Sequence, residues 1–505
     1  MEENTWSTFL DGNNNTYSYS CVKDTLDNVY AVGYSDSNII KIGEKYYSKN
    51  SESSAGYIVK LDNLGNALWF YWIDGDTLQS VYSIAIDKNN NVYLTGYSNS
   101  DKIILKEVSY SKSNNTLAGF VVKFNQLGDV LWFNWIDGAK SDTGYSIAVD
   151  SNNNIYITGV SNSNSLNNII KISNDNAGFL IKMNDLGSII WFKWIEGPND
   201  DDSYSLVIDS LNNIYVSGNS NSNNIKINNN TYFRNNNNQS IYLAKFTPEG
   251  IDVWCFWISG DNIDTVSSII CDTYNYIYLC GISNSTTITI NNKAYNRTYK
   301  DNLNSSFVIK INSNNTHNID WFKWIEGDSD GFSYTIATDN SNNLYLTGTT
   351  KSEYIMIDKI QYDNSSFNEN AYLLKLNNQG DLDWIKWLFN YEKFEENKEY
   401  RPKAYIANIF IDQNYNIYIN GYTNAKQLCL NNDIIVSKNN ENDNTFIIKY
   451  DLNEIAKLEN IKIYLLIPNN YFAYNYFSYM LVRIIIFMMF IYIIWIIYES
   501  TTTST

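Results

Sequence analysis

Proline is scarce in this sequence, with four residues in 505. Turns must therefore be made by other residues, and the many Asn, Asp and Ser residues bend the chain through side-chain hydrogen bonds to the backbone. Aromatic residues are abundant, with 42 Tyr, 22 Phe and 14 Trp. Because aromatic side chains favour strands, the composition predicts an all-β fold for most of the chain and argues against a helix-rich one.

The sequence contains too few cysteines and histidines for most metal sites, redox sites or catalytic triads. The five cysteines are Cys21, Cys255, Cys271, Cys280 and Cys429. Their odd number and the lack of a Cys-x-x-Cys pair predict reduced, buried thiols. The single histidine, His317, is expected in a surface turn, although any Ser-His-Asp or Cys-His site would have to use it. We therefore expect no catalytic residue, metal or cofactor.

Positive charge is also in short supply. Lys and Arg number 36 against 54 Asp and Glu, which gives a formal net charge of -18. Affinity for nucleic acid comes largely from clustered basic side chains that displace counterions, so we expect no nucleic-acid partner. The start, Met1 to Thr5, has neither a basic residue nor an apolar run. No cleavable secretory signal is expected, and the chain is expected to stay in the cytosol.

One unit recurs seven times along the chain. Its most regular landmark is an Asp, a Tyr six residues later, and a Gly three residues after that. The copies are Asp24/Tyr30/Gly33, Asp87/Tyr93/Gly96, Asp150/Tyr156/Gly159, Asp209/Tyr215/Gly218, Asp272/Tyr278/Gly281, Asp339/Tyr345/Gly348 and Asp412/Tyr418/Gly421. Successive glycines are 63, 63, 59, 63, 67 and 73 residues apart. This period of about 63 residues suits four short strands, the content of one β-propeller blade.

Each unit contains four predicted strands, named A to D. Strand A leads through an Asn-rich turn into strand B, as at 145–150 and 155–159, and the two form a hairpin. Strand C reads aromatic-x-x-Lys-apolar, and in six of the seven units strand D carries two tryptophans three residues apart, such as Trp132 and Trp135. Residues three apart on a strand point to opposite faces. Both faces of the sheet must then be covered, as in a blade packed between two neighbours.

The two ends of the repeat region indicate that the ring closes. The sequence opens on a D strand, Trp6 to Gly12, whereas the last unit has strands A, B and C and reaches Tyr450. The N-terminal strand is therefore predicted to complete the seventh blade, which removes two open sheet edges. Ile461 to Ile467 is also strand-like and could compete for the same position.

These motifs resemble the bacterial SBBP β-propeller repeat, which runs through a Phe-Val-x-Lys-Leu strand, a Gly turn, a strand ending in Gly-Gly, an Ala-Val-Asp strand and Tyr-Val-x-Gly. Here Phe120 to Ser163 reads FVVKFNQLGDVLWFNWIDGAKSDTGYSIAVDSNNNIYITGVSNS, and the likeness spans about Asn4 to Asp451. The D strands of this chain end in Asp-Gly or Glu-Gly. The family's Phe-Pro segment is replaced by Asn-rich segments such as Asn168 to Ile172. The resemblance implies a scaffold with no reaction attached.

Residues present in every unit belong to the framework, because a catalytic site needs one asymmetric cluster. Each repeated Asp is expected to cap the A–B turn, and each strand-C Lys to meet a carboxylate. These lysines are Lys60, Lys123, Lys182, Lys245, Lys310, Lys375 and Lys449. Asp87-x-Asn89-x-Asn91 and Asp150-x-Asn152-x-Asn154 imitate the first half of a calcium loop. They lack its Gly at position six and its acidic residue at position twelve, so turns are predicted there.

Two groups of charged residues differ between units. The carboxylates after the D strands could form a partial acidic ring that attracts a cation or a basic partner, with solvated loop ends as the alternative. They are Asp11, Asp74, Asp137, Glu196 and Glu326, interrupted by Ser259 and Asn390. The longest D-to-A loop, Asn390 to Lys403, is rich in Glu and Lys. It is either a binding loop or a solvated insertion.

Near the C-terminus, Tyr479 to Tyr498 reads YMLVRIIIFMMFIYIIWIIY, twenty residues with one charge. About twenty apolar residues cross the hydrocarbon of a bilayer as a helix. Arg483 lies near one end, and Trp495 and Tyr498 at the other suit a membrane interface. We predict a single-pass helix, inserted after synthesis, that leaves the propeller in the cytosol.

Together the patterns predict an all-β, seven-bladed propeller of four-stranded blades at 1–452, a linker at 453–478, a transmembrane helix at 479–498 and a polar tail at 499–505. The expected function is a membrane-anchored scaffold that binds a protein, or a glycan, without catalysis. Two alternatives remain open. One is a propeller enzyme with a site in the central channel, and the other is a secreted surface adhesin.

Overall fold

The computed structural model describes residues 5–234, 236, 238–298, 303–313, 318–364, 370–390, 403–425, 427–430, 433–437 and 442–452. The predicted linker, transmembrane helix and tail lie outside these residues, as do His317, Ile461 to Ile467 and most of the Asn390 to Lys403 loop. Within the described part of the chain, no helix is both long and apolar enough to span a bilayer. Met1–Tyr450 forms one compact unit and Asp451–Thr505 a second, and only the first is described below.

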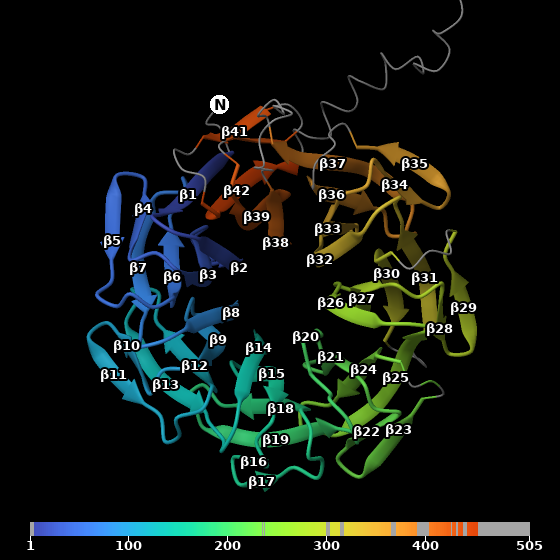
Figure 1. The fold of residues 1–505 in the computed structure, drawn as a ribbon, viewed down its shortest axis with the longest axis horizontal. Coiled ribbons are helices and arrows are strands. Elements are labelled where there is room, and N and C mark those ends of the chain that lie inside the picture. The colour runs from blue at the N-terminus through green and yellow to red at the C-terminus, as the bar shows by residue number, and fades with distance from the viewer. Residues whose placement is uncertain are drawn as a thin grey trace, which may run out of the picture. The chain divides into compact units, whose positions relative to one another are not determined.

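Seven antiparallel blades surround a central axis, with the A strands innermost and the D strands outside them (Figure 1). The A strands are β2 (Thr16–Lys23), β8 (Gln79–Ile86), β14 (Asp142–Val149), β20 (Ser205–Ile208), β26 (Asp264–Cys271), β32 (Gly331–Thr338) and β38 (Ala404–Ile411). The B strands are β3 (Val29–Ser35), β9 (Val92–Ser98), β15 (Ile155–Ser161), β21 (Ile214–Ser220), β27 (Tyr276–Ser283), β33 (Leu344–Thr350) and β39 (Asn416–Thr423).

The outer half of each blade follows in the same order. The C strands are β6 (Ala55–Leu61), β12 (Ala118–Phe124), β18 (Ala177–Met183), β24 (Ser240–Phe246), β30 (Ser305–Asn312), β36 (Asn370–Leu376) and β42 (Asn444–Asp451). The D strands are β7 (Ala67–Ile73), β13 (Val130–Ile136), β19 (Ile189–Glu196), β25 (Asp252–Gly260), β31 (Asn318–Ile325), β37 (Leu382–Asn390) and β1 (Trp6–Gly12). Blades are numbered 1 to 7 from the A strand β2 to the A strand β38. The predicted seven-bladed propeller is confirmed.

Ring closure occurs as predicted, because the N-terminal strand β1 is the D strand of blade 7. It pairs antiparallel with β42, from Trp6 opposite Lys449 to Leu10 opposite Thr445. The backbone N–H of Thr16, at the start of blade 1, donates to the carbonyl of Asp443 at 2.7 Å. The first and last blades are thus joined in two ways. Strand β1 belongs to the sheet of blade 7, and the chain then runs directly from β1 into blade 1.

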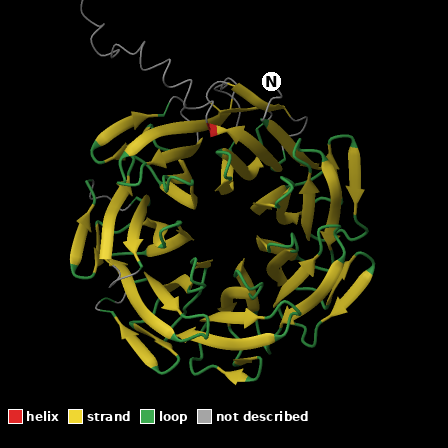
Figure 2. Cartoon of the chain, turned by 180° about the vertical axis from the view of Figure 1, so that it is seen from behind, coloured by secondary structure: helices red, strands yellow, loops and turns green. Residues whose placement is uncertain are grey.

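The segments between strands B and C form outer hairpins, which the sequence pattern did not predict (Figure 2). They are β4 (Ile39–Ile42) with β5 (Lys45–Ser48), β10 (Lys102–Leu105) with β11 (Val108–Ser111), β16 (Ser165–Leu166) with β17 (Ile169–Ile170), β22 (Asn224–Ile227) with β23 (Asn230–Phe233), β28 (Thr287–Ile290) with β29 (Lys293–Asn296), β34 (Tyr354–Ile357) with β35 (Ile360–Asp363), and β40 (Gln427–Leu430) with β41 (Asp433–Ser437). Most of them bond to the D strand of the preceding blade, as where Ser259 pairs with Thr289. Each such hairpin therefore crosses a blade boundary.

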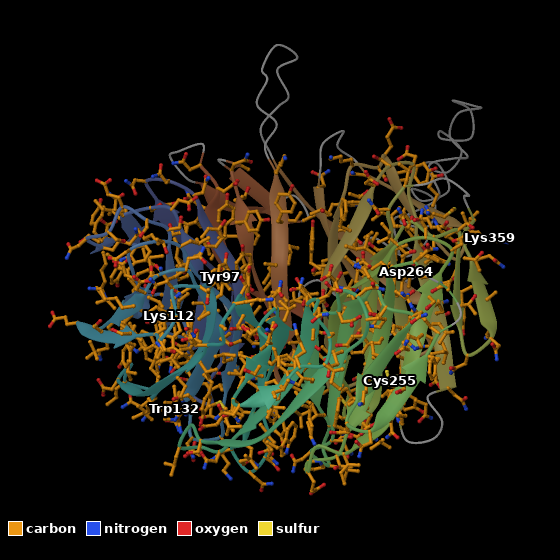
Figure 3. The ribbon with its side chains drawn as sticks, turned by 60° about the horizontal axis from the view of Figure 1, so that its bottom comes forward. Tyr97, Lys112, Trp132, Cys255, Asp264 and Lys359 are labelled. Atoms are coloured by element: carbon orange, nitrogen blue, oxygen red, sulfur yellow. The ribbon has the colours of Figure 1, made fainter. Side chains whose placement is uncertain are left out.

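The propeller has two faces, which are named here by their connections. The A–B and C–D turns, such as 24–28 and 62–66, form the turn face. The D-to-A and B-to-C connections form the loop face. In Figure 3, Asp264 lies toward the loop face, at the start of β26, whereas Trp132 lies toward the turn face.

The core lies between the blades, and the paired tryptophans show why. Trp132 packs with Tyr93 and Ile147 between blades 2 and 3. Trp135, on the opposite face of β13, packs with Val81 and other residues between blades 1 and 2. The prediction that the D strands bury an indole on each face is confirmed, so each blade depends on two neighbours.

The closure contact predicts a stability difference between two leucines on D strands. Leu10 of β1 is fully buried beside Tyr418 and Ile447 of blade 7, whereas Leu68 of β7 is 49% exposed. Leu10→Ala should lower the free energy of unfolding by about 2–5 kcal/mol because it leaves a cavity. Leu68→Ala, the matched control, should change it by about 0.5 kcal/mol or less. Urea denaturation of both variants measures this, and equal effects would contradict closure through β1.

Candidate functional site in the central channel

Each repeated Asp caps its A–B turn, as predicted. In blade 2 the Asp87 carboxylate accepts the backbone N–H groups of Asn89 at 2.8 Å and Asn91 at 2.9 Å. It also accepts the Tyr93 hydroxyl at 2.9 Å. Two backbone donors and the landmark Tyr meet the Asp in all seven blades. The calcium-like spacing is therefore turn chemistry, and among the described residues no group of three or more His, Cys, Asp or Glu could hold a metal ion.

The strand-C lysines are framework residues, but the predicted carboxylate partner is not their common feature. Ion pairs are found for Lys60 with Asp24 at 3.5 Å, for Lys123 with Asp185, and for Lys375 with Asp383 at 2.9 Å. In all seven blades the Lys Nζ instead lies over the landmark Tyr ring, 4.9 to 6.0 Å from its centre. The predicted carboxylate is thus confirmed as an ion pair at three lysines. Burial lowers the pKa of Lys182, Lys245 and Lys310, and the charge of the nearby landmark Asp opposes that effect. The contact shared by all seven lysines is the tyrosine face.

The same lysines tie neighbouring blades together. Lys182 of blade 3 donates to the carbonyl of Pro248, in the C–D turn of blade 4, at 2.8 Å. The indole N–H of Trp191 donates to that carbonyl at 3.2 Å. The carbonyls of Asp185 and Asn378 receive equivalent bonds from the Lys and Trp of the preceding blades. The ammonium groups of these lysines are therefore already hydrogen-bonded at the blade boundaries.

A second series of cations was missed at the sequence level. Lys49, Lys112, Lys171, Arg234 and Arg297 lie 5.1 to 5.9 Å from the ring centres of Trp72, Trp135, Trp194, Trp257 and Trp324. Burial lowers the pKa of the three lysines. The spacing of the series, 63, 59, 63 and 63 residues, follows the repeat. That periodicity was the signal that could have revealed the series.

Three of the carboxylates after the D strands bond to backbone groups next to the outer hairpins. The Glu196 carboxylate is buried and accepts the backbone N–H groups of Ile172 at 2.7 Å and Ser173 at 2.8 Å. Glu326 accepts the N–H of Thr298 at 2.9 Å, and Asp137 accepts that of Ser113 at 3.0 Å. Each donor follows an outer hairpin. For Asp137, Glu196 and Glu326, both the free acidic ring and the solvated loop end are therefore corrected, because these carboxylates anchor the outer hairpins.

Three buried aspartates lie where the chain enters the A strands of blades 3 to 5: Asp142 and Asp264 begin β14 and β26, and Asp201 precedes β20 by four residues. Asp264 accepts the hydroxyls of Ser283 at 2.5 Å and Ser285 at 3.0 Å, and also the N–H of Gly260. Burial raises the pKa of Asp264 to about 7, that of Asp201 to about 7 and that of Asp142 to about 6. In blade 2 the position is Gln79, whose amide donates to Ser98 and Ser100.

These aspartates predict how stability depends on pH. Their pKa values in the folded state exceed the unfolded value of about 3.9, so the folded state binds more protons between about pH 4 and pH 7. Stability should therefore fall as pH rises through that range. Asp264→Asn should reduce the slope and raise the free energy of unfolding by on the order of 2 kcal/mol at pH 8. Thermal unfolding from pH 4 to pH 8 measures both effects.

Gln79→Glu is the reciprocal variant, since it places a carboxylate at the matching site of blade 2. It should steepen the fall in melting temperature with rising pH. A flat profile for Gln79→Glu, or an unchanged slope for Asp264→Asn, would contradict the assignment.

The A strands line the central channel, and bulges direct their side chains into it. In β2 the register with β3 shifts between Ser18 and Ser20, so Tyr19 is the bulged residue. The same shift occurs in β8, β14, β26, β32 and β38. Because a bulge re-aims side chains, Tyr19 and Ser20 both border a recess of about 550 Å³. Its lining comprises Tyr19, Ser20, Tyr82, Ser83, Tyr145, Ser146, Tyr204, Ser205, Ser267, Ser268, Tyr334, Thr335, Tyr405, Ile406, Ala407, Asn408 and Tyr422.

Tyrosines form a continuous belt along this channel. In order of contact, the tyrosine belt is Tyr204, Tyr145, Tyr82, Tyr19, Tyr34, Tyr17, Tyr422, Tyr405 and Tyr334. Successive ring centres are 4.8 to 6.3 Å apart. The belt passes through blades 4, 3, 2, 1, 7 and 6. At blade 5 it is interrupted, because Ser267 occupies the bulged position there.

Hydroxyl groups next to the belt join one A strand to the next. The Ser83 hydroxyl accepts the backbone N–H of Ile147 at 3.3 Å, and Ser146 accepts that of Leu206 at 3.4 Å. At the closure seam the Asn408 side-chain oxygen takes this role. These bonds join blade 2 to 3, blade 3 to 4 and blade 7 to 1 along the inner wall of the channel.

The recess is uncharged. None of the described residues that line it is acidic or basic. Burial, with smaller effects of Asp202 and Tyr204, raises the pKa of Tyr145 to about 12. Burial also raises the pKa of Tyr19 and Tyr82. The phenols are therefore neutral at physiological pH. These tyrosines were not identified as a site from the sequence, because strand A was treated as a regular strand whose side chains alternate between two faces.

Exposed apolar side chains form an arc on the turn face. Blades 1 to 4 each expose one apolar residue near the C–D turn and one early in strand D. This apolar arc is Leu64, Leu68, Leu127, Leu131, Leu186, Ile190, Ile251 and Val253, which are 49% to 79% exposed. Gly128, beside Leu127, lies against Tyr71 and the Trp69 indole of the preceding blade. Asp320 and Asp383 hold the matching D-strand positions of blades 5 and 6.

The cysteines agree with the sequence reading where they are described. Cys21 and Cys280 are buried, Cys255 and Cys271 are partly buried, and all four are free thiols. Burial raises the pKa of Cys271 to about 12, which keeps it protonated. The Cys429 side chain lies outside the described residues.

Comparison with known proteins agrees with this architecture. Residues 73–103, 123–167 and 190–226 match the SBBP β-propeller repeat. An uncharacterized WD repeat-containing protein of Acanthamoeba polyphaga mimivirus is 23% identical over 418 residues, 68% of this chain. The chain spans about 30% of the length of that relative.

Similar solved structures include a protein of unknown function from Dyadobacter fermentans and Sqt1 from Chaetomium thermophilum. The first is 10% identical with a TM-score of 0.38, over 88% of this chain and 99% of the other. The second is 9% identical with a TM-score of 0.39, over 85% and 86%. The observed blades identify the compact unit as a seven-bladed β-propeller, and three of its segments are similar to the SBBP repeat.

Proposed function

We propose that the protein is a non-catalytic binding scaffold, held at a membrane by residues 479–498, whose ligand occupies the tyrosine-lined channel. The tyrosine belt is the observation that carries this proposal. Tyrosine combines a large, rigid contact surface with a polar tip, which suits it to binding surfaces. The blades do not need these rings, because blades 5 and 7 keep the bulge with Ser267 and Ala407 in place of tyrosine.

The distribution of charge supports binding over catalysis. The repeated aspartates cap turns, the lysines lie at blade boundaries, and the D-strand carboxylates that were traced anchor the outer hairpins. The recess is left with hydroxyls, an amide and neutral phenols. General acid–base catalysis works best with a group that titrates near the working pH. A lining of neutral groups suits recognition instead.

The apolar arc supports a membrane orientation. Strand β42 runs from the loop face to the turn face, so the propeller's chain ends on the face that carries the arc. Twenty-six residues, 453–478, separate Leu452 from the apolar run at 479–498. Contiguous exposed apolar surface marks an interaction site. We infer that the turn face lies toward the membrane and that the loop face, where the belt tyrosine Tyr17 bonds Asp443, lies toward the cytosol.

The tether is tested by truncation. Full-length protein with a tag at Met1 should sediment with membranes and resist extraction by high salt, because an apolar helix holds it. A chain stopped after Leu458 should be soluble. Protease added to intact membranes should remove the tag, as expected for a cytosolic propeller. A truncated chain that stays with membranes, or a protected tag, would contradict the tether or its orientation.

The role of the channel is tested by proximity labelling in cells. The double variant Tyr82→Ala/Tyr145→Ala should lose a discrete set of labelled neighbours, because two contact surfaces of the belt are removed while the bulges remain. Tyr46→Ala is the matched control, since Tyr46 lies on an outer hairpin and is 68% exposed. Its labelling pattern should equal that of the wild type. Equal patterns for all three proteins would exclude the channel as the binding site.

A further inference from the structure

The chemistry of the recess narrows the class of ligand. Some belt hydroxyls are bonded within the wall: Tyr334 shares a hydrogen bond of 3.0 Å with Thr349, and the Tyr17 hydroxyl donates to Asp443 at 3.1 Å. Tyr334 lines the recess, so it offers its ring surface, rather than its hydroxyl, to the channel. The belt therefore provides apolar, polarisable surface that can stack on a ligand.

The serines beside the belt provide a second kind of contact. Ser83, Ser146 and Ser205 each accept one backbone N–H from the next blade, at 3.3 to 3.4 Å. This bond fixes the position of the oxygen. A hydroxyl that accepts one hydrogen bond still has a proton to donate and a second lone pair. The recess thus presents ordered alcohol groups that can both donate and accept.

Charge argues against an ionic ligand. The lining is uncharged, and the formal net charge of the chain is -18, which disfavours anions. A cation would require a carboxylate in the recess. Asp202, close to Tyr145 and Tyr204, instead accepts the N–H of Asn219 at 2.9 Å, and its side chain is not part of the lining. The ligand expected here is neutral.

We propose that the recess binds a neutral saccharide chain. The C–H faces of a pyranose ring are apolar and stack on tyrosine rings, while its hydroxyls exchange hydrogen bonds with Ser83, Ser146 and their counterparts. The volume of about 550 Å³ is in the range of small-ligand sites. The gap in the belt at blade 5, with Ser267 and Ser268, orients the more hydroxylated edge of the sugar. This proposal rests on the assignment of the channel as the binding site.

Calorimetric titration of the full-length protein with defined probes tests the proposal. The neutral probes are maltohexaose, cellohexaose and hexa-N-acetylchitohexaose, and the acidic probe is hexagalacturonate. At least one neutral hexamer should bind, and hexagalacturonate should not. Tyr82→Ala should weaken binding about tenfold, the effect of one aromatic contact. Tyr82→Phe should retain binding because it keeps the ring, and Tyr46→Ala should bind as the wild type does.

Tyr145→Ser supplies a second belt variant that copies the residue of blade 5, in case Tyr82→Ala fails to fold. Its melting temperature should stay close to that of the wild type while affinity falls. Binding of no neutral hexamer, binding that survives Tyr145→Ser, or tighter binding of hexagalacturonate would overturn the proposal. If a hexaproline peptide or tetramethylammonium binds instead and depends on the same tyrosines, the saccharide proposal fails while the channel remains a binding site. A labelling pattern insensitive to Tyr82 and Tyr145 would remove the binding site itself.

Discussion

The whole structure depends on the contact between one blade and the next. Six of the seven D strands carry an indole on both faces, as Trp132 and Trp135 do in β13, and β1 carries Trp6 and Phe9 at the same spacing. A terminal blade in an open row would expose one of these indoles and one sheet edge to water. When β1 pairs with β42, the first and last blades become neighbours, and no blade is left at an open end. The aromatic content of the D strands therefore explains why a ring, and not an open array, is the stable arrangement.

Polar contacts at the same boundaries account for most of the repeated charges. A strand-C lysine lies over a tyrosine of its own blade and, as Lys182 shows, donates to a turn carbonyl of the next. A second cation, such as Lys171, lies over the other indole of the D strand. Buried cations need such partners, because an unpaired charge in the interior is strongly unfavourable. Charge that looks reactive in the sequence is thus used to align blades.

A structural feature could be predicted from the sequence mainly when the residues that form it lie close together along the chain. The Asp87 turn and its Tyr93 partner were predictable, because donors and acceptor lie within six residues. Closure was predictable from counting strands. The outer hairpins were not, because segments such as Asn168 to Ile172 are short and pair with a different blade. The tyrosine belt was not predicted, because the sequence analysis of a strand assumes that successive side chains alternate between its two faces. The bulge at Tyr19 breaks that alternation.

Function in a sevenfold framework must come from what differs between blades. Two differences stand out, and they lie in different parts of the propeller. The belt is complete in six blades and absent at Ser267, which gives an otherwise symmetric channel one distinct side. The apolar arc covers blades 1 to 4 and gives way to Asp320 and Asp383. Neither difference disturbs the turn caps or the blade contacts, so each could vary without cost to the fold. Residues that the fold does not require in this way are the ones available for binding a ligand.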